Sequence, residues 1–263
     1  MAEATQSIPS LAALCVARLA AGAPQRVLLN ILRRLPEELV LKLLADMITS
    51  KTLTDDRLAA FFMISRRVLK LSGCCSIRNS ILRQIPFRCP ELACRSLTDI
   101  NFSRCKRIDD DAIHLLLRSA TDLQRLNLSF MDISDKAFTT EPSDQRNGFY
   151  AMGHRGVGML GVYGQQLERL NLSWCMNITD KSVVDIARGC EHLQEVLLVW
   201  CTQLTDAAID AFIPDPESIS QAAAASSAVR AKNLTLNFSG CKNIGDALIE
   251  YARQKGLKII TGT

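Results

Sequence analysis

The sequence contains few of the residues on which metal sites and nucleophilic enzymes depend. Only three histidines occur among 263 residues, and no two of the ten cysteines form a C-x-x-C pair. The histidines are His114, His154 and His192, and none lies at metal-ligand spacing from a cysteine. No Gly-x-Ser-x-Gly or Cys–His signature surrounds them. We therefore expect no metal site, no cofactor and no enzymatic activity.

Long runs of one residue class are also missing. No run of Lys or Arg accompanies the net charge of +4, so a nucleic-acid partner is not expected. No stretch reaches the roughly 18 apolar residues of a membrane span. The apolar segment Ala12–Ala23 follows Glu3, lacks a basic region before it and is interrupted by Arg18, which argues against a signal peptide. The sequence predicts a soluble protein of the cytoplasm, the nucleus or both.

Two short patterns that could suggest ligand sites have simpler interpretations. The glycine-rich segment 153–164 contains no G-K-[ST] and does not follow a buried strand, so an exposed loop is favoured over a phosphate loop. The run Asp109–Asp111 is interpreted as a helix start rather than a metal site, because carboxylates stabilise the positive end of a helix dipole.

The clearest pattern in the chain is QLERLNLSWCMNITD, residues 166–180. Its Leu167, Leu170, Leu172 and Cys175 have the spacing L-x-x-L-x-L-x-x-C, the signature of a cysteine-containing leucine-rich repeat. Similar units recur along the chain, with the last position, the anchor, at Cys74, Cys105, Met131, Cys175, Cys201 and Cys241. A buried position explains these cysteines as small apolar side chains, and free thiols are typical of a reducing compartment.

The repeats predict an α/β fold: a right-handed leucine-rich-repeat solenoid, a horseshoe arc with parallel strands on its concave face and helices outside. The anchors at 105 and 131, and at 175 and 201, are 26 residues apart, whereas other gaps are longer. The surplus predicts exposed insertions near 139–165 and 214–232. A closing strand is expected at Leu257–Ile260. Pairs that can cap the helix after each strand are Thr54-Asp55, Asp109-Asp110, Ser134-Asp135, Thr179-Asp180 and Thr205-Asp206.

Residues 1–51 do not follow the repeat and are predicted to form a helical N-terminal cap, followed by the repeat domain at 52–263. Leu11, Cys15 and Leu19 recur every four residues, which places them on one helix face. A second helix is predicted to start at Leu35-Pro36-Glu37-Glu38, with Leu39 and Leu43 continuing its apolar face. Gly22-Ala23-Pro24 is interpreted as a break between the two.

The repeats, and LNLSWCMNITD above all, resemble the cysteine-containing leucine-rich repeats of F-box substrate receptors of ubiquitin ligases. The length, repeat number and helical N-terminus are most similar to the antagonist of mitotic exit network protein family, over roughly residues 52 to 261. The two insertions depart from that family's regular spacing. The resemblance implies a non-enzymatic substrate-recognition subunit of a cullin-type ubiquitin ligase, either SCF-like or elongin–cullin, that acts in ubiquitin-dependent protein degradation.

The N-terminal helices extend this resemblance. Ser10-Leu11-x-x-x-Cys15-x-x-x-Leu19 is similar to the box by which receptors bind elongin C, and Leu35-Pro36-x-x-Leu39-x-x-x-Leu43 is similar to the cullin box. The second segment also resembles the start of an F-box, which would bind a Skp-type adaptor. The alternative is a helical cap with no adaptor. Exposure of Leu11, Cys15 and Leu19 to solvent would favour docking, and their burial against Leu58 and Phe61 would favour the cap.

A column of residues just before the anchors is the candidate target site, because equivalent positions stack from repeat to repeat. It contains three aromatic residues in succession, and polar strand residues surround them. The partner-binding residues expected on the concave face are Arg104, Arg125, Asn127, Phe130, Arg169, Asn171, Trp174, Glu195, Leu197 and Trp200. The alternative is that Trp174 and Trp200 only pack against each other at the rim. A binding scaffold or inhibitor with no ligase attached is the second functional hypothesis.

Overall fold

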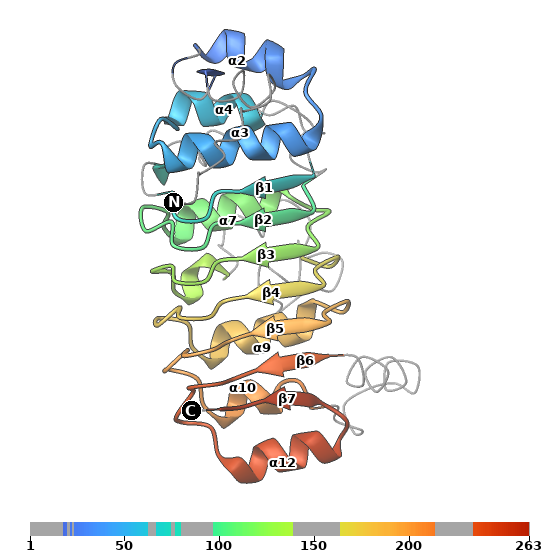
Figure 1. The fold of residues 1–263 in the computed structure, drawn as a ribbon. Helices are drawn as coiled ribbons and strands as arrows, with labels where there is room; N and C mark the ends of the chain where they lie inside the picture. Colours follow the sequence, from blue (N-terminus) through green and yellow to red (C-terminus); the bar gives the residue numbers. More distant parts are fainter. Residues whose placement is uncertain are drawn as a thin grey trace, which may run out of the picture.

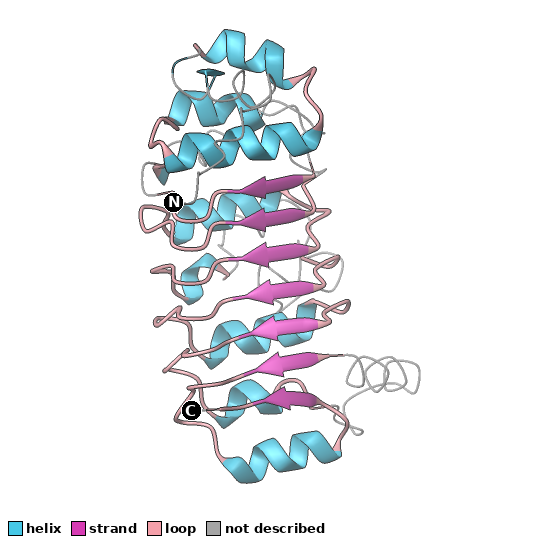
Figure 2. Cartoon of the chain, in the orientation of Figure 1, coloured by secondary structure: helices cyan, strands magenta, loops and turns pink. Residues whose placement is uncertain are grey.

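A computed structural model describes residues 18, 19, 22, 24–62, 67–74, 77–79, 97–138, 164–213 and 234–262. Its centre is a sheet of seven parallel strands that pair in the order of the chain. Helices cover one side of the sheet, and each strand is one step further along an elongated arc (Figures 1 and 2). This arrangement confirms the predicted leucine-rich-repeat solenoid. The strands are β1 Val68–Lys70, β2 Asp99–Asn101, β3 Arg125–Asn127, β4 Arg169–Asn171, β5 Glu195–Leu197, β6 Thr235–Asn237 and β7 Lys258–Ile260.

The register of the sheet follows the repeat spacing without a slip. Leu126 pairs with Leu170, and Leu170 pairs with Val196, so the central inward-facing residues of successive strands lie side by side. These side chains are buried, whereas the residues on either side of each are at least partly exposed. Strands β3 and β4 keep this register although 41 residues, 128–168, lie between Asn127 and Arg169 in the chain. Residues 139–163 and 214–233, where both predicted insertions fall, lie outside the described residues.

The helical segments between strands begin at the residues that the predicted capping pairs indicate. Side chains of Asp109, Ser134, Thr179 and Thr205 each accept a hydrogen bond from a backbone N–H in the first turn that follows. After Ser134 the helical segment is a short 3₁₀ turn rather than an α-helix. The described elements on this side of the sheet are α7 Asp110–Ser119, η1 Asp135–Ala137, α9 Asp180–Gly189, α10 Asp206–Asp210 and α12 Asp246–Gln254.

Between residues 24 and 62, which the structure describes without a gap, three helices precede the first strand: α2 Gln25–Leu32, α3 Glu37–Thr49 and α4 Asp55–Phe62. The predictions of a helix start near Pro36 and of a helix after Thr54-Asp55 are confirmed. Helix α2 was not predicted, because Gly22-Ala23-Pro24 was interpreted only as a break; Pro24 in fact precedes its first turn. Helix α2 packs against α4, and α3 contacts β1. One continuous hydrophobic core runs from Leu28 in α2 to Ile259 in β7.

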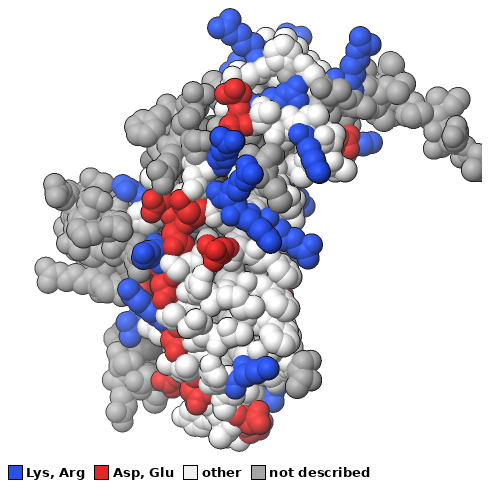
Figure 3. All heavy atoms as spheres, turned by 90° about the vertical axis from the view of Figure 1, so that its left-hand side faces the viewer, with Lys and Arg blue, Asp and Glu red and all other residues white. Residues whose placement is uncertain are grey.

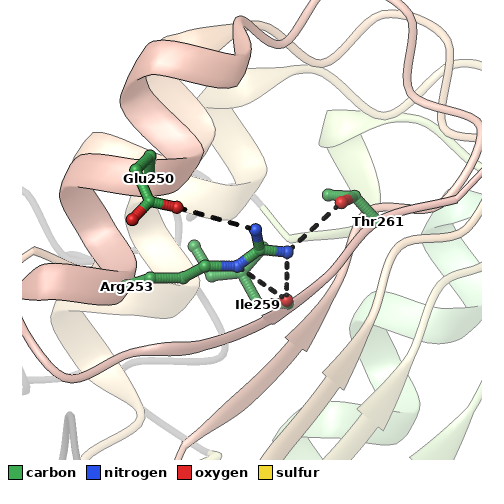
Figure 4. A network of polar contacts seen from close by, with 4 residues as sticks. All are labelled: Glu250, Arg253, Ile259 and Thr261. Carbon is green, nitrogen blue, oxygen red and sulfur yellow. Dashed lines mark hydrogen bonds and ion pairs between the residues drawn. The ribbon is translucent and has the colours of Figure 1, made fainter.

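The C-terminal end of the sheet is closed by Arg253 of α12. Ile260 accepts a hydrogen bond from Phe238, so its carbonyl points towards β6 and the carbonyl of Ile259 points to the open edge. The Arg253 guanidinium donates to the Ile259 oxygen from Nη2 at 3.0 Å and from Nε at 3.4 Å (Figure 4). It also reaches the Thr261 hydroxyl at 3.4 Å and lies 3.9 Å from Glu250. An edge carbonyl is thereby satisfied.

Among the described residues, no helix has the length and apolar character that a bilayer crossing requires.

Candidate functional site

The residue before each anchor forms a column at the carboxyl edge of the sheet, which we call the aromatic column. Every member has a left-handed backbone, with φ between +58° and +77°. Each backbone N–H donates to a carbonyl of the next repeat, or of the C-terminal segment, at 2.8–2.9 Å. The column therefore carries a second ladder of hydrogen bonds beyond the strands. Its members are Gly73, Arg104, Phe130, Trp174, Trp200 and Gly240.

The three rings of the aromatic column form one continuous stack. Phe130 and Trp174 are 5.5 Å apart between ring centroids and are inclined by 9°. Trp174 and Trp200 are 5.2 Å apart and are inclined by 20°. Each such contact contributes about 0.5–1.5 kcal/mol beyond burial. Both faces of the Trp174 ring are covered by its neighbours in the stack.

Both ends of the stack are closed by a cation. The Arg104 guanidinium lies 4.7 Å from the centre of the Phe130 ring, and Lys242 Nζ lies 5.9 Å from the centre of the Trp200 ring. Gly240 gives Trp200 its room, because a Cβ at residue 240 would approach the ring atoms to 2.7 Å. A cation thus lies at each end of the stack, and the backbone of Gly240, which has no side chain, lies against the Trp200 ring.

The aromatic column packs internally and remains open to solvent. Phe130 is 40% exposed, Trp174 is 36% exposed and Trp200 is partly exposed. The rim-packing alternative is therefore correct for Trp174 and Trp200 as a contact, but it does not remove them from the surface. Figure 3 shows the side of the molecule that lies to the left in Figure 1, where the strands end. A broad uncharged area there lies beside Lys and Arg side chains and a line of Asp and Glu.

The charged strand residues predicted for the concave face lie in register beside one another. Arg125 forms an ion pair with Asp99 at 3.2 Å. Arg169 pairs in register with Arg125 on one side and with Glu195 on the other. Arg169 is exposed, and within the described part of the chain it forms no ion pair. It is therefore available to an anionic partner.

The side chains of the asparagines predicted for the concave face form hydrogen bonds within their own repeats. The Asn127 side-chain oxygen accepts from the Ser129 N–H at 3.0 Å, and Asn171 accepts from Ser173 at 2.9 Å. Asn101 and Asn237 make the same bond. These bonds fix the turn into the aromatic column, a role that the sequence analysis did not assign.

Leu197 interrupts the asparagine row. It occupies the same register position as Asn171 and Asn237 but has no oxygen to offer. The Val199 N–H in that turn donates instead to the Ser173 hydroxyl of the neighbouring repeat at 3.3 Å. A half-buried leucine thus lies between two asparagines on the concave face.

The anchor cysteines are structural. Cys105, Cys175, Cys201 and Cys241 each donate the thiol proton to a carbonyl of the preceding repeat at 3.0–3.2 Å. Burial raises the pKa of Cys175 to about 12 and raises that of Cys201 further. A thiol that keeps its proton is a poor nucleophile and a poor metal ligand. Among the described residues, no group of three or more His, Cys, Asp or Glu side chains is placed to hold a metal ion.

A row of aspartates joins the helix starts of neighbouring repeats. The Asp135 carboxylate accepts from the N–H and hydroxyl of Thr179 at 3.0 and 2.6 Å, and from the Ser182 hydroxyl at 2.5 Å. Asp110 binds Ser134, and Asp180 binds Thr205, through the same pair of groups. Burial alone would raise the pKa of Asp135, but the bonds from Ser182 and Thr179 with Lys181 nearby lower it overall.

The residues predicted to bind an adaptor lie in different environments. Leu11 and Cys15 are outside the described residues. Leu19 and Leu35 are partly buried and pack against the core, and Leu43 is fully buried. Leu39 is half-buried and Pro36 is exposed. In this arrangement Leu43 belongs to the core, and only the exposed part of the set is open to a partner.

One of three comparisons with known proteins, that with family models, agrees with the repeat class. A family model described as "Leucine Rich repeat" matches residues 165–187. The F-box protein SKIP1 of Arabidopsis thaliana is 24% identical over 128 residues, which is 49% of this chain and 41% of SKIP1. The chain thus spans less than half of that relative. A crystal structure of the yeast Rad7 and Elc1 complex matches over 97% of this chain and 93% of the other at 13% identity, with a TM-score of 0.33.

Proposed function

We propose that this protein is the substrate-recognition subunit of a cullin-type ubiquitin ligase, and that it acts in ubiquitin-dependent protein degradation. The match of half of the chain to an F-box protein carries this proposal. The protein would perform no chemistry of its own and would work in the cytoplasm or nucleus. Its role would be to hold a target protein while partner subunits transfer ubiquitin.

The target would bind at the aromatic column and the neighbouring concave strands. Large aromatic and arginine side chains dominate protein interfaces, and Phe130, Trp174 and Arg169 are exposed there. Parallel strands and the backbone ladder hold these groups on rigid elements, so little ordering would accompany binding. The adaptor, either elongin C or a Skp-type protein, and through it a cullin, would bind the N-terminal helices at Leu11, Cys15 and Pro36.

A protein-binding scaffold or inhibitor without a ligase is the second candidate. The observation that favours it is the burial of α3, in which Leu43 is fully buried, and of Leu35 just before it, which packs on the same core. This region would then serve as a cap over the first strand. The two candidates share the target surface and differ only in whether an adaptor binds.

Copurification of the full chain with coexpressed elongin C or a Skp-type adaptor tests the proposal. Residues 1–51 should not be deleted, because α2 and α3 contribute to the continuous core. The variants Leu11→Asp and Cys15→Asp should abolish adaptor capture and leave thermal unfolding unchanged. Tyr251→Ser, at an exposed position of α12, is the matched control and should capture adaptor normally. Absence of capture by the unmodified chain would leave the scaffold as the better account.

A further inference from the structure

We propose that the aromatic column binds an acidic segment of a target protein, an inference that rests on the proposed target-binding role. It concerns the chemistry of the partner, which the likeness to F-box proteins does not specify.

The rings of the aromatic column present their edges to solvent. Trp174 has Phe130 on one face and Trp200 on the other. The outer face of Phe130 is covered by Arg104, and Trp200 lies against Gly240 and Lys242. Because these faces are covered, the part of the Phe130 and Trp174 rings that solvent reaches is their edge. Aromatic edges carry the positive end of the ring quadrupole, so they favour an anionic neighbour.

Hydrogen-bond donors add to this positive character. The indole N–H groups of Trp174 and Trp200 have no acceptor among the described residues. An indole N–H is a donor only, and a carboxylate is an acceptor only, so the two are complementary. The ring faces are already occupied, which leaves no platform on which a nucleic-acid base could stack. The column thus favours an acidic peptide over single-stranded nucleic acid.

Cations lie at both ends of the column and beside it. Arg104 is followed by the exposed Lys106 and Arg107, and Lys242 lies at the other end. On the strands, Arg169 forms no ion pair among the described residues; Glu195 lies in register with it on β5 and Glu168 precedes it in the chain, whereas Asp99 on β2 is paired with Arg125. Figure 3 shows Lys and Arg side chains gathered above the uncharged area, and a line of Asp and Glu along its left side. Carboxylates at each end of a bound segment would meet these charges.

The length of the partner follows from the strand spacing. Neighbouring strands lie about 4.8 Å apart, so a chain reaching from Arg104 to Lys242 needs roughly six extended residues. A peptide of alternating Glu and Gly that is at least this long is a suitable probe. Matched peptides with Gln or Lys in place of Glu are its controls.

The test uses intrinsic fluorescence, because the only two tryptophans of the chain are Trp174 and Trp200. Titrating the full chain with the Glu peptide should change tryptophan emission saturably, and added salt should weaken binding. The Gln and Lys peptides should give no saturable change. Arg104→Gly should weaken binding of the Glu peptide about tenfold, the effect of one lost charge-assisted hydrogen bond. Glycine is compatible with this backbone, because Gly73 and Gly240 occupy the same position.

Lys255→Gln is the matched control. Lys255 also lies over an aromatic ring, that of Tyr251 on α12, but outside the column. Its removal should leave peptide binding unchanged. Equal weakening by Lys255→Gln and Arg104→Gly would overturn the proposal, as would column-dependent binding of a single-stranded RNA oligomer with no response to the Glu peptide. Adaptor capture is measured without peptide, so failure here is separate from failure of the ligase proposal.

Discussion

The hydroxyl of Thr179 donates to the Asp135 carboxylate at 2.6 Å, although the two residues are 44 positions apart in the chain. The segment between them includes a predicted insertion, so this bond connects repeats that are distant in sequence and adjacent in space. It holds the start of α9 against the start of η1, and the same carboxylate also accepts from Ser182. Three donors therefore depend on one side chain.

Replacing that carboxylate tests how strongly the helix starts are coupled. Asp135→Asn leaves at least one of the three donors without an oxygen acceptor, and we expect the free energy of unfolding to fall by about 1–3 kcal/mol. Urea unfolding measures the change. Asp122→Asn, at an exposed position with one long contact to Thr121, should alter stability by less than about 0.5 kcal/mol. Equal stability of the two variants would contradict the coupling.

We expect acidic pH to reduce the stability that the Asp135 carboxylate contributes. The pKa of Asp135 is lowered in the folded state, so its contribution is present above the unfolded pKa of about 3.9 and is lost as pH falls through the folded pKa. The native protein should therefore lose stability more steeply in acid than Asp135→Asn does. Urea midpoints between about pH 6 and about pH 3 provide the comparison, and parallel curves would exclude this role.

Alkali should act on the anchor thiols. The folded pKa of Cys175 is about 12 and the unfolded value is about 8.5, so the stabilising proton is fully bound below the unfolded pKa. Stability should fall as pH rises between these values, by up to about 1.4 kcal/mol per pH unit for one thiol. Cys175→Ala should show a shallower slope in urea unfolding above about pH 9. An unchanged slope would show that Cys175 does not titrate in this way.

The left-handed backbone of the aromatic column predicts an unusual order of stability among variants at Trp174. Trp174→Gly and Trp174→Ala both lose two ring contacts, so both should be less stable than the native protein. The positive φ at this position is unfavourable for alanine but not for glycine. The glycine variant should therefore be the more stable by about 1 kcal/mol. At the exposed neighbour Met176, where φ is not positive, alanine should equal or exceed glycine. Thermal unfolding distinguishes the two orders.

Leu197 offers a substitution that should restore a repeat feature. Leu197→Asn supplies the oxygen that Asn171 and Asn237 supply in the neighbouring turns, so it should be about 1 kcal/mol more stable than Leu197→Ala. The Val199 amide should exchange with solvent more slowly in the asparagine variant. If the Val199 amide hydrogen exchanges at an unchanged rate, the new asparagine side chain does not accept a hydrogen bond from that amide.

The presence and order of the strands could be predicted because one short spacing determines them. The leucine pattern before the anchor Cys175 indicates a strand around Leu170, where β4 lies, and the same pattern finds β5 and β6. Helix α2 could not be placed in this way, since Pro24 makes no side-chain cap bond and no repeat precedes it. The spacing of Leu28 and Leu32, both buried on one face, was the available signal.

The candidate column could be located from the sequence, but its geometry could not. The signal for a left-handed backbone was present, because Gly73 and Gly240 share the position of Trp174 and Trp200. Ring stacking depends on side-chain rotamers, which depend in turn on neighbours such as the bare backbone at Gly240. The asparagine bonds are not evident from the sequence, because an outward-facing polar residue is compatible both with a bond inside its own repeat and with a contact to a partner.

Arg253 has a consequence for how copies of this molecule behave towards one another. A parallel sheet that ends in an uncovered strand can accept a strand from a second molecule and so grow into fibres. Because the guanidinium already occupies the Ile259 carbonyl, the edge of β7 is a poor template for such growth. At the other end, α3 contacts β1. Both ends of the described sheet are therefore partly covered, which disfavours growth by the addition of strands.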